Sequence, residues 1–144
     1  MNVGRLVYLY VLSLGALLLL EGSVLLVVDR LPLSLGFTAS DTRHNLLHIV
    51  WGAALLGVVL RARRSYRVAW AAVIFGLFYI GLAVLGVTLD RPFGLLLGPG
   101  ENVFHFTVGP LALLLGAWAL RSSSASRPLT SAATGGEGSG SPAR

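Results

Sequence analysis

The chain has 144 residues, of which 55% are hydrophobic and only 12% are charged. A soluble domain usually carries about 25% charged residues, and one of this length has too little interior to bury so much apolar surface. The composition therefore excludes an ordinary soluble domain and predicts a membrane protein. The chain has no cysteine, which excludes disulfides, cysteine-ligated zinc, iron–sulfur clusters and thiol catalysis.

Four apolar stretches follow one another along the chain, at residues 6–28, 45–60, 68–89 and 102–120. A bilayer core about 30 Å thick takes about 20 residues of helix. The second stretch reaches that length if its helix begins at Asp41 or Thr42, both suitable helix caps. The stretches are continuously apolar, whereas membrane strands alternate. We therefore predict an all-α four-helix membrane bundle over residues 1–121, with helices at about 5–28, 42–61, 67–89 and 101–120.

Residues 122–144 consist mainly of Ser, Gly, Ala, Thr and Pro and offer almost nothing to bury. Such a composition predicts a disordered tail. The connection between the first and second stretches and the one between the third and fourth are unusually apolar, especially at residues 31–37 and 92–98. We expect these two segments to lie at the headgroup level or to fold over the bundle, and a lid over a site is the alternative.

Arginines concentrate on one side of the predicted bundle. Most of them lie before the first stretch, between the second and third, or after the fourth, among them Arg5, Arg61, Arg63, Arg64, Arg67, Arg121 and Arg127. The other two connections hold only Arg30, Arg43 and Arg91, set among acidic residues. The positive-inside rule then places both termini and the tail in the cytoplasm. We expect a multi-pass protein of the bacterial cytoplasmic membrane, in contact with the lipid bilayer and not with nucleic acid. Binding of anionic lipid is a second interpretation of the same arginines, and a homo-oligomer or an unknown membrane partner stays open.

The second and fourth predicted helices begin with the same motif. One reads His44-Asn45-Leu-Leu-His48 with Gly52 following, and the other reads Glu101-Asn102-Val-Phe-His105 with Gly109 following. The first and third stretches also end alike, in Asp-Arg with a proline close by. These matches predict two tandem helical hairpins in one orientation, which is a parallel internal repeat.

The paired motifs resemble those of a family of small bacterial membrane proteins, the domain of unknown function 4383. Its members carry H-N-x-x-H at the start of one helix and D/E-N-x-x-H at the start of a later one, and residues 44–48 and 101–105 match both. The resemblance covers roughly residues 5–120. It implies a four-helix membrane fold and supplies no activity.

Five polar residues within the apolar stretches form the candidate site: Glu21, Asn45, His48, Asn102 and His105. At about 100° per residue, the Asn and His of each motif share one helix face, which should face the bundle interior because lipid disfavours polar groups. The third stretch has Leu82 in the place aligned with Glu21, so the site is asymmetric. We expect the Glu21, His48 and His105 side chains inside the bundle, with two of them in hydrogen-bond reach, directly or through one water.

Four roles fit these residues. We favour a set of interhelical hydrogen bonds that fixes the register of the helices, each contributing about 0.6 kcal/mol, and we call it the hydrogen-bond lock. The protein would then be a structural or interaction membrane protein and not an enzyme. The alternatives are a proton or small-molecule site, haem b held by His48 and His105, and a metal held by His44, His48 and Glu21. We discount the metal because zinc needs three or four ligands and His44 is expected to be exposed. We find no nucleophile–base pair and predict no catalytic residue. We also predict no cofactor, with haem b as the alternative.

Overall fold

The computed structural model describes residues 2–28, 41–62, 65–89 and 91–125. They form four long helices, α1 (Val3–Val28), α2 (Thr42–Arg61), α3 (Ser65–Thr88) and α4 (Pro99–Ala125), and a 3-10 turn, η1 (Pro92–Gly94). Each of the four is long and apolar enough to cross a membrane, so the predicted all-α four-helix membrane bundle is confirmed. The predicted loop at 31–37 and the tail from 126 onward lie outside the described residues.

Capping residues set several of the helix ends. The Asp41 side chain accepts a hydrogen bond of 2.9 Å from the backbone N–H of Arg43, which caps the start of α2. Helix α4 begins at Pro99, where a proline costs no helical hydrogen bond. It ends at Ala125, five residues beyond its apolar stretch, and the Ser123 hydroxyl there donates to the carbonyl of Ala119 at 2.8 Å.

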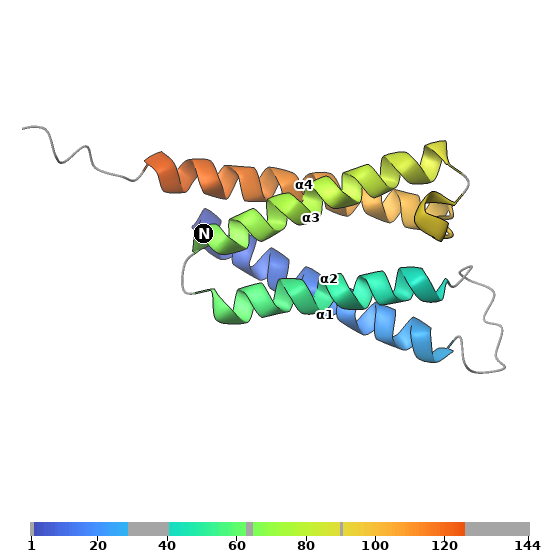
Figure 1. Ribbon diagram of the computed structural model, residues 1–144. Coiled ribbons are helices and arrows are strands. Elements are labelled where there is room, and N and C mark those ends of the chain that lie inside the picture. Colours follow the sequence, from blue (N-terminus) through green and yellow to red (C-terminus); the bar gives the residue numbers. More distant parts are fainter. Residues whose placement is uncertain (1, 29–40, 63–64, 90, 126–144) are drawn as a thin grey trace, which may run out of the picture.

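The four helices form two antiparallel hairpins, α1 with α2 and α3 with α4 (Figure 1). Glycines allow the closest contacts within each hairpin. A Cβ added to Gly52 would lie 2.5 Å from the backbone nitrogen of Leu19, and one added to Gly76 would lie 2.6 Å from that of Leu113. Neither position has room for a side chain, so the backbones of each pair approach more closely than larger residues permit.

The two hairpins pack through a core in which α1 contacts both α3 and α4. Its largest fully buried side chains include Leu18 of α1, Leu55 of α2 and Phe75 of α3. The Tyr10 hydroxyl of α1 donates a hydrogen bond of 3.1 Å to the carbonyl of Val108 on α4, which links the two hairpins. Helices α2 and α3 follow each other in the chain but share less contact than either hairpin pair.

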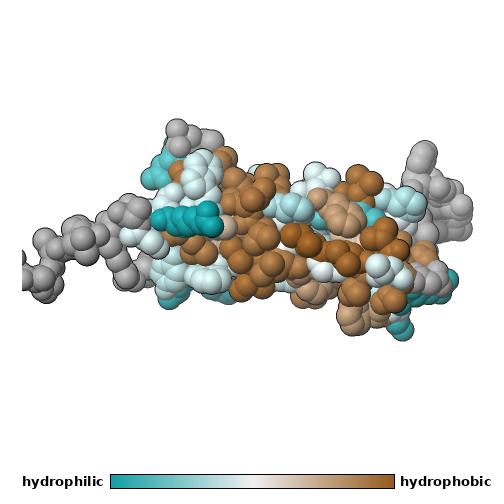
Figure 2. Space-filling view, turned by 90° about the horizontal axis from the view of Figure 1, so that it is seen from above, coloured by the Kyte–Doolittle hydropathy of each residue, from teal (hydrophilic) through white to brown (hydrophobic). Residues whose placement is uncertain are grey.

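On the face shown in Figure 2, mostly apolar side chains cover the middle of the bundle, and polar ones gather toward its ends. Because the helices alternate in direction, the start of α1, the end of α2, the start of α3 and the end of α4 share one end (Figure 1). Four arginines of the described residues lie there: Arg5, Arg61, Arg67 and Arg121. The opposite end carries the candidate polar residues.

Candidate functional site

All three histidines of the chain meet inside the bundle. His44 and His48 lie one turn apart on α2, and His105 lies in the second turn of α4. Their exposed fractions are 6%, 4% and 0%. One ring nitrogen from each lies within 4.8 Å of the other two. We call these residues the three-histidine cluster.

The rings pack against one another without hydrogen bonds. The His44 centroid lies 4.4 Å from that of His48 and 5.5 Å from that of His105, edge-on in both cases. Five buried ring nitrogens have no hydrogen-bond partner among the described residues: Nε2 of His44 and both nitrogens of His48 and of His105. Burial of a polar group without a partner costs free energy, and such groups are rare in folded proteins.

The burial of His44 corrects our expectation that this residue is exposed. His44 lies in the first turn of α2, but it shares the inward face with His48 because residues four apart lie on the same side of a helix. His44 therefore joins His48 and His105 as a third buried imidazole. The set that we discounted consisted of His44, His48 and Glu21. The structure instead groups His44 and His48 with His105.

Glu21 contacts the cluster from its edge. Its Oε2 lies 3.5 Å from Nδ1 of His48, an ion-pair distance, but the geometry does not make a hydrogen bond. The Glu21 side chain is 40% exposed, so the prediction that it lies inside the bundle is wrong. The next residue, Gly22, explains the approach, because a Cβ there would lie 2.9 Å from Cβ of His48.

The two asparagines lie beside the cluster. Asn45 is buried on α2, with 2% of its surface exposed. Asn102 donates from Nδ2 to the carbonyl of Gly86 on α3 at 3.2 Å. That bond joins α3 to α4, so Asn102 provides an interhelical hydrogen bond of the kind that we predicted, but to a backbone carbonyl and not to a histidine.

Tyr79 belongs to the same environment and was missed by the sequence analysis. It is fully buried on α3, and its ring lies edge-on to that of His105 with centroids 4.9 Å apart. Its hydroxyl has no hydrogen-bond partner among the described residues. The sequence holds a weak signal for it, because Tyr79 carries a polar group in the middle of an uncharged apolar run.

The end of the bundle near the cluster is covered by the segment that follows η1. The backbone N–H of Leu96 donates to Oδ2 of Asp41 at 2.9 Å, and Leu95 and Leu97 are buried against Leu82 of α3. This apolar segment folds over the bundle as expected. Asp41 and Glu101 lie close enough to His44 to interact with its charge, and Arg43 and Arg91 lie beside Asp41 at the same end of the bundle.

No protein-family model, curated protein or solved structure matches the chain. The resemblance to the domain of unknown function 4383 therefore stays a prediction from two short motifs. The chemistry of this protein has to be inferred from its own residues.

Proposed function

We propose that this multi-pass membrane protein binds one divalent transition-metal ion through His44, His48 and His105. The proposal rests on the convergence of three buried imidazoles whose ring nitrogens lie within 4.8 Å of one another. A Zn–N bond of about 2.05 Å with tetrahedral angles separates ligand nitrogens by ~3.3 Å. Metal binding would therefore require the three rings to rotate until their nitrogens reach that spacing.

The geometry supports a metal better than the hydrogen-bond lock that the sequence favoured. A lock needs histidines that bond to neighbouring polar groups, whereas five of their nitrogens have no partner among the described residues. It also supports a metal better than haem b. A haem ligated by His48 and His105 has to stand between their rings, and the ring of His44 packs against both.

The ligand set narrows the class of ion. Imidazole ligands suit zinc, copper, nickel and iron, while magnesium and calcium prefer oxygen ligands. Glu21 fits the role of a carboxylate that holds a ligating histidine in place. Because its oxygen faces Nδ1 of His48, His48 would bind the ion through Nε2. Three protein ligands leave a fourth position for water or another small ligand. We propose binding and assign no reaction.

The metal content of the purified protein tests the proposal. The protein should be purified in detergent with an affinity tag that lacks histidine, loaded with Zn²⁺ or Co²⁺, and freed of unbound ion. We expect one ion per chain, and visible Co²⁺ absorption bands typical of a tetrahedral site. Both should disappear in His48→Ala and His105→Ala, and both should persist in Thr107→Ala, because Thr107 is exposed on α4.

Two outcomes would overturn the proposal. One is a folded wild-type protein that retains no metal, and the other is metal retention by the histidine variants. A Soret band lost on substitution of His48 or His105 would establish haem b instead.

We further propose that the protein lies in a bacterial cytoplasmic membrane with both termini in the cytoplasm. The arginines at one end support this orientation by the positive-inside rule, and the metal site would then open toward the outside. The chain has no native cysteine, so single cysteines can report the topology. One at Phe93, which is 79% exposed, should react with an impermeant thiol reagent in intact cells, and one at Ser65 should react only after lysis.

The two hairpins support the proposed internal repeat. Gly52 and Gly109, which occupy the same place in the two motifs, each pack against a glycine of the preceding helix, Gly15 in one hairpin and Gly76 in the other. Equivalent positions of the motif thus make equivalent contacts, as duplication of one hairpin predicts.

A further inference from the structure

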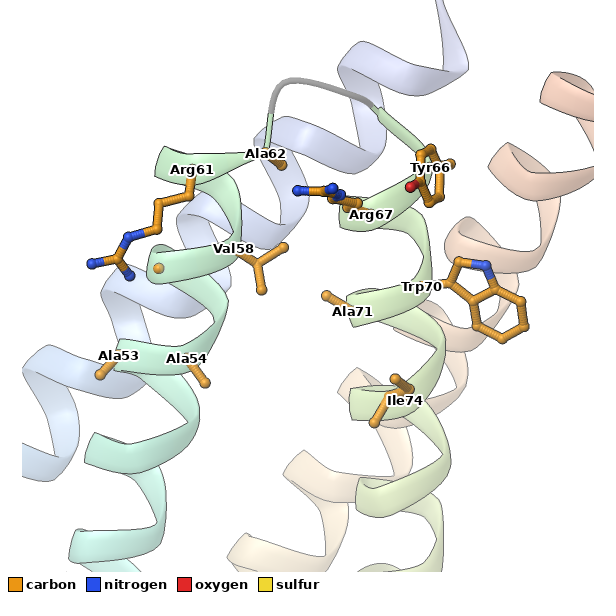
Figure 3. Close-up of a pocket in the computed structure, with 11 residues that line it drawn as sticks. Ala53, Ala54, Val58, Arg61, Ala62, Tyr66, Arg67, Trp70, Ala71 and Ile74 are labelled. Atoms are coloured by element: carbon orange, nitrogen blue, oxygen red, sulfur yellow. The ribbon is translucent and has the colours of Figure 1, made fainter.

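A groove of about 550 Å³ lies between α2 and α3 at the arginine-rich end of the bundle. Figure 3 shows its lining. Small side chains form its walls, among them Ala53, Ala54 and Gly57 of α2 and Ala71 of α3. Because these residues fill little space, the gap between the two helices stays open here. The volume lies within the range of about 300–1,000 Å³ that is typical of ligand sites.

Two arginines stand at the open end of this groove. Arg67 extends from α3 into the space between the two helices, and Arg61 lies on α2 (Figure 3). The Arg61 side chain runs back along its helix, since a Cβ added to Gly57 would lie 3.4 Å from Nη1 of Arg61. The described lining contains no acidic residue, so an anion at this position meets positive charge from both helices.

Aromatic residues accompany the arginines. Tyr66 and Trp70 line the groove from α3 and are 40% and 52% exposed. Tyrosine and tryptophan are enriched at the boundary between the apolar core of a bilayer and its headgroups. The groove therefore runs from the headgroup level, at the arginines, into the apolar zone beside Ala54 and Ile74.

We propose that the groove binds one anionic phospholipid. Its phosphate would lie beside Arg67, and the Arg61 side chain would turn from its place along α2 (Figure 3) toward the same phosphate, because guanidinium groups bind phosphate oxygens in pairs. One acyl chain would lie along the small side chains of α2 and α3. The arginines favour an anionic lipid over a zwitterionic one, and the apolar walls favour a lipid over a free phosphate. The site is separate from the three-histidine cluster, which lies at the other end of the bundle.

Quenching of Trp70 fluorescence by brominated lipids tests this proposal. The chain has three tryptophans, so Trp51→Phe with Trp118→Phe leaves Trp70 as the only reporter. In phosphatidylcholine vesicles at equal mole fraction, brominated phosphatidylglycerol should quench Trp70 more than brominated phosphatidylcholine does. Each arginine should contribute roughly fivefold to that preference. In Arg61→Gln with Arg67→Gln the two lipids should quench alike.

A matched variant removes two arginines from the same end without touching the groove. Arg5→Gln with Arg121→Gln should keep the preference, because neither residue lines the groove. Arg61→Lys with Arg67→Lys retains the charge and should keep part of the preference, which separates lipid binding from misfolding. Thermal unfolding of each variant checks that the bundle is intact.

Three results would overturn the proposal. The first is equal quenching of the wild-type reporter by the two lipids. The second is an equal loss of preference in both glutamine pairs, which would show a general effect of charge at this end. The third is a Trp70 shielded from both lipids in a dimeric protein, which would show that a second copy of the chain fills the groove.

Discussion

The imidazole of His44 on α2 lies edge-on to that of His105 on α4, with ring centroids 5.5 Å apart. The two residues belong to different hairpins, so their contact crosses the interface between the halves of the bundle. An ion held by both would link the hairpins, and its binding would favour the associated state. Metal affinity and the stability of the bundle should therefore be coupled.

Zinc should raise the thermal unfolding temperature of the wild-type protein in detergent. An ion that binds only the folded state stabilises it by about 2.7 kcal/mol at a free concentration about 100 times its Kd. His105→Leu should abolish this shift. Without metal, His105→Leu should be neutral or stabilising, because leucine replaces a buried ring whose nitrogens have no partner in the described structure.

The opposite pattern would support the hydrogen-bond lock. In that case His105→Leu lowers the free energy of unfolding by about 1 kcal/mol without metal, and zinc has no effect on the wild type. Thr107→Val is the control for α4. Within the described part of the chain its hydroxyl bonds only to the carbonyl of Val103 in its own helix, at 2.8 Å, so this variant should keep the zinc shift.

Acid should release the metal. A histidine binds a metal only when it is neutral, and its ordinary pKa is about 6.5. Protons therefore compete with the ion as the pH falls below that value, and three ligands make the loss steep. Glu21, Asp41 and Glu101 are the acidic groups near the cluster. Equilibrium dialysis with Co²⁺ from pH 8 to pH 5 covers about 1.5 units on either side of that pKa. It should show tight binding at pH 8 and release of the ion at pH 5. Binding that does not change with pH would contradict histidine ligation.

Glu21→Gln should weaken metal binding without abolishing it. Oε2 of Glu21 lies 3.5 Å from Nδ1 of His48, so the carboxylate can hold this ring in place. Loss of such a carboxylate typically lowers the metal affinity by roughly 10- to 100-fold. Ser23→Ala is the control, because Ser23 is exposed on the same helix and, among the residues that the structure describes, bonds only to the carbonyl of Leu19. Isothermal titration with Zn²⁺ measures both. Complete loss of binding in Glu21→Gln would mean that the carboxylate is itself a ligand.

Hydropathy was sufficient to predict the four helices, because a span of the bilayer requires a length and an apolar composition that can be counted in the sequence. The start of α2 was also predicted, since Asp41 is a good cap and its side chain does accept the N–H of Arg43. The pairing within hairpins follows from glycines that admit a neighbouring backbone. The length of the connections does not explain it, because the shortest one joins α2 to α3, which share less contact than either hairpin pair.

The composition of the site was harder to predict. His44 lies at the very start of α2, where the depth of a residue depends on how the next segment covers the helix end. Leu96 and its neighbours provide that cover by bonding to Asp41. Which helix of the second hairpin faces His44 also depends on how the hairpins pack together, and the period of one helix carries no information about that.

The glycine contacts should determine the stability of each hairpin. Alanine at Gly52 places a Cβ 2.5 Å from the backbone nitrogen of Leu19, and alanine at Gly76 places one 2.6 Å from that of Leu113. Real Cβ atoms do not approach backbone so closely, so the helices must move apart. Such overpacking typically costs about 1–3 kcal/mol.

Gly81→Ala is the matched control, because it makes the same change in α3 at a position where a Cβ would meet nothing within 4 Å. It should be neutral or should stabilise the protein by up to about 1 kcal/mol, since alanine favours a helix over glycine. Unfolding in mixed detergent micelles measures the difference among Gly52→Ala, Gly76→Ala and Gly81→Ala. Because Gly52 and Gly76 each make a close backbone contact within one hairpin, at 2.5 and 2.6 Å, their variants should lose similar free energies of unfolding. Destabilisation by Gly81→Ala as large as that by the other two would show that helix flexibility, and not close packing, sets the need for glycine.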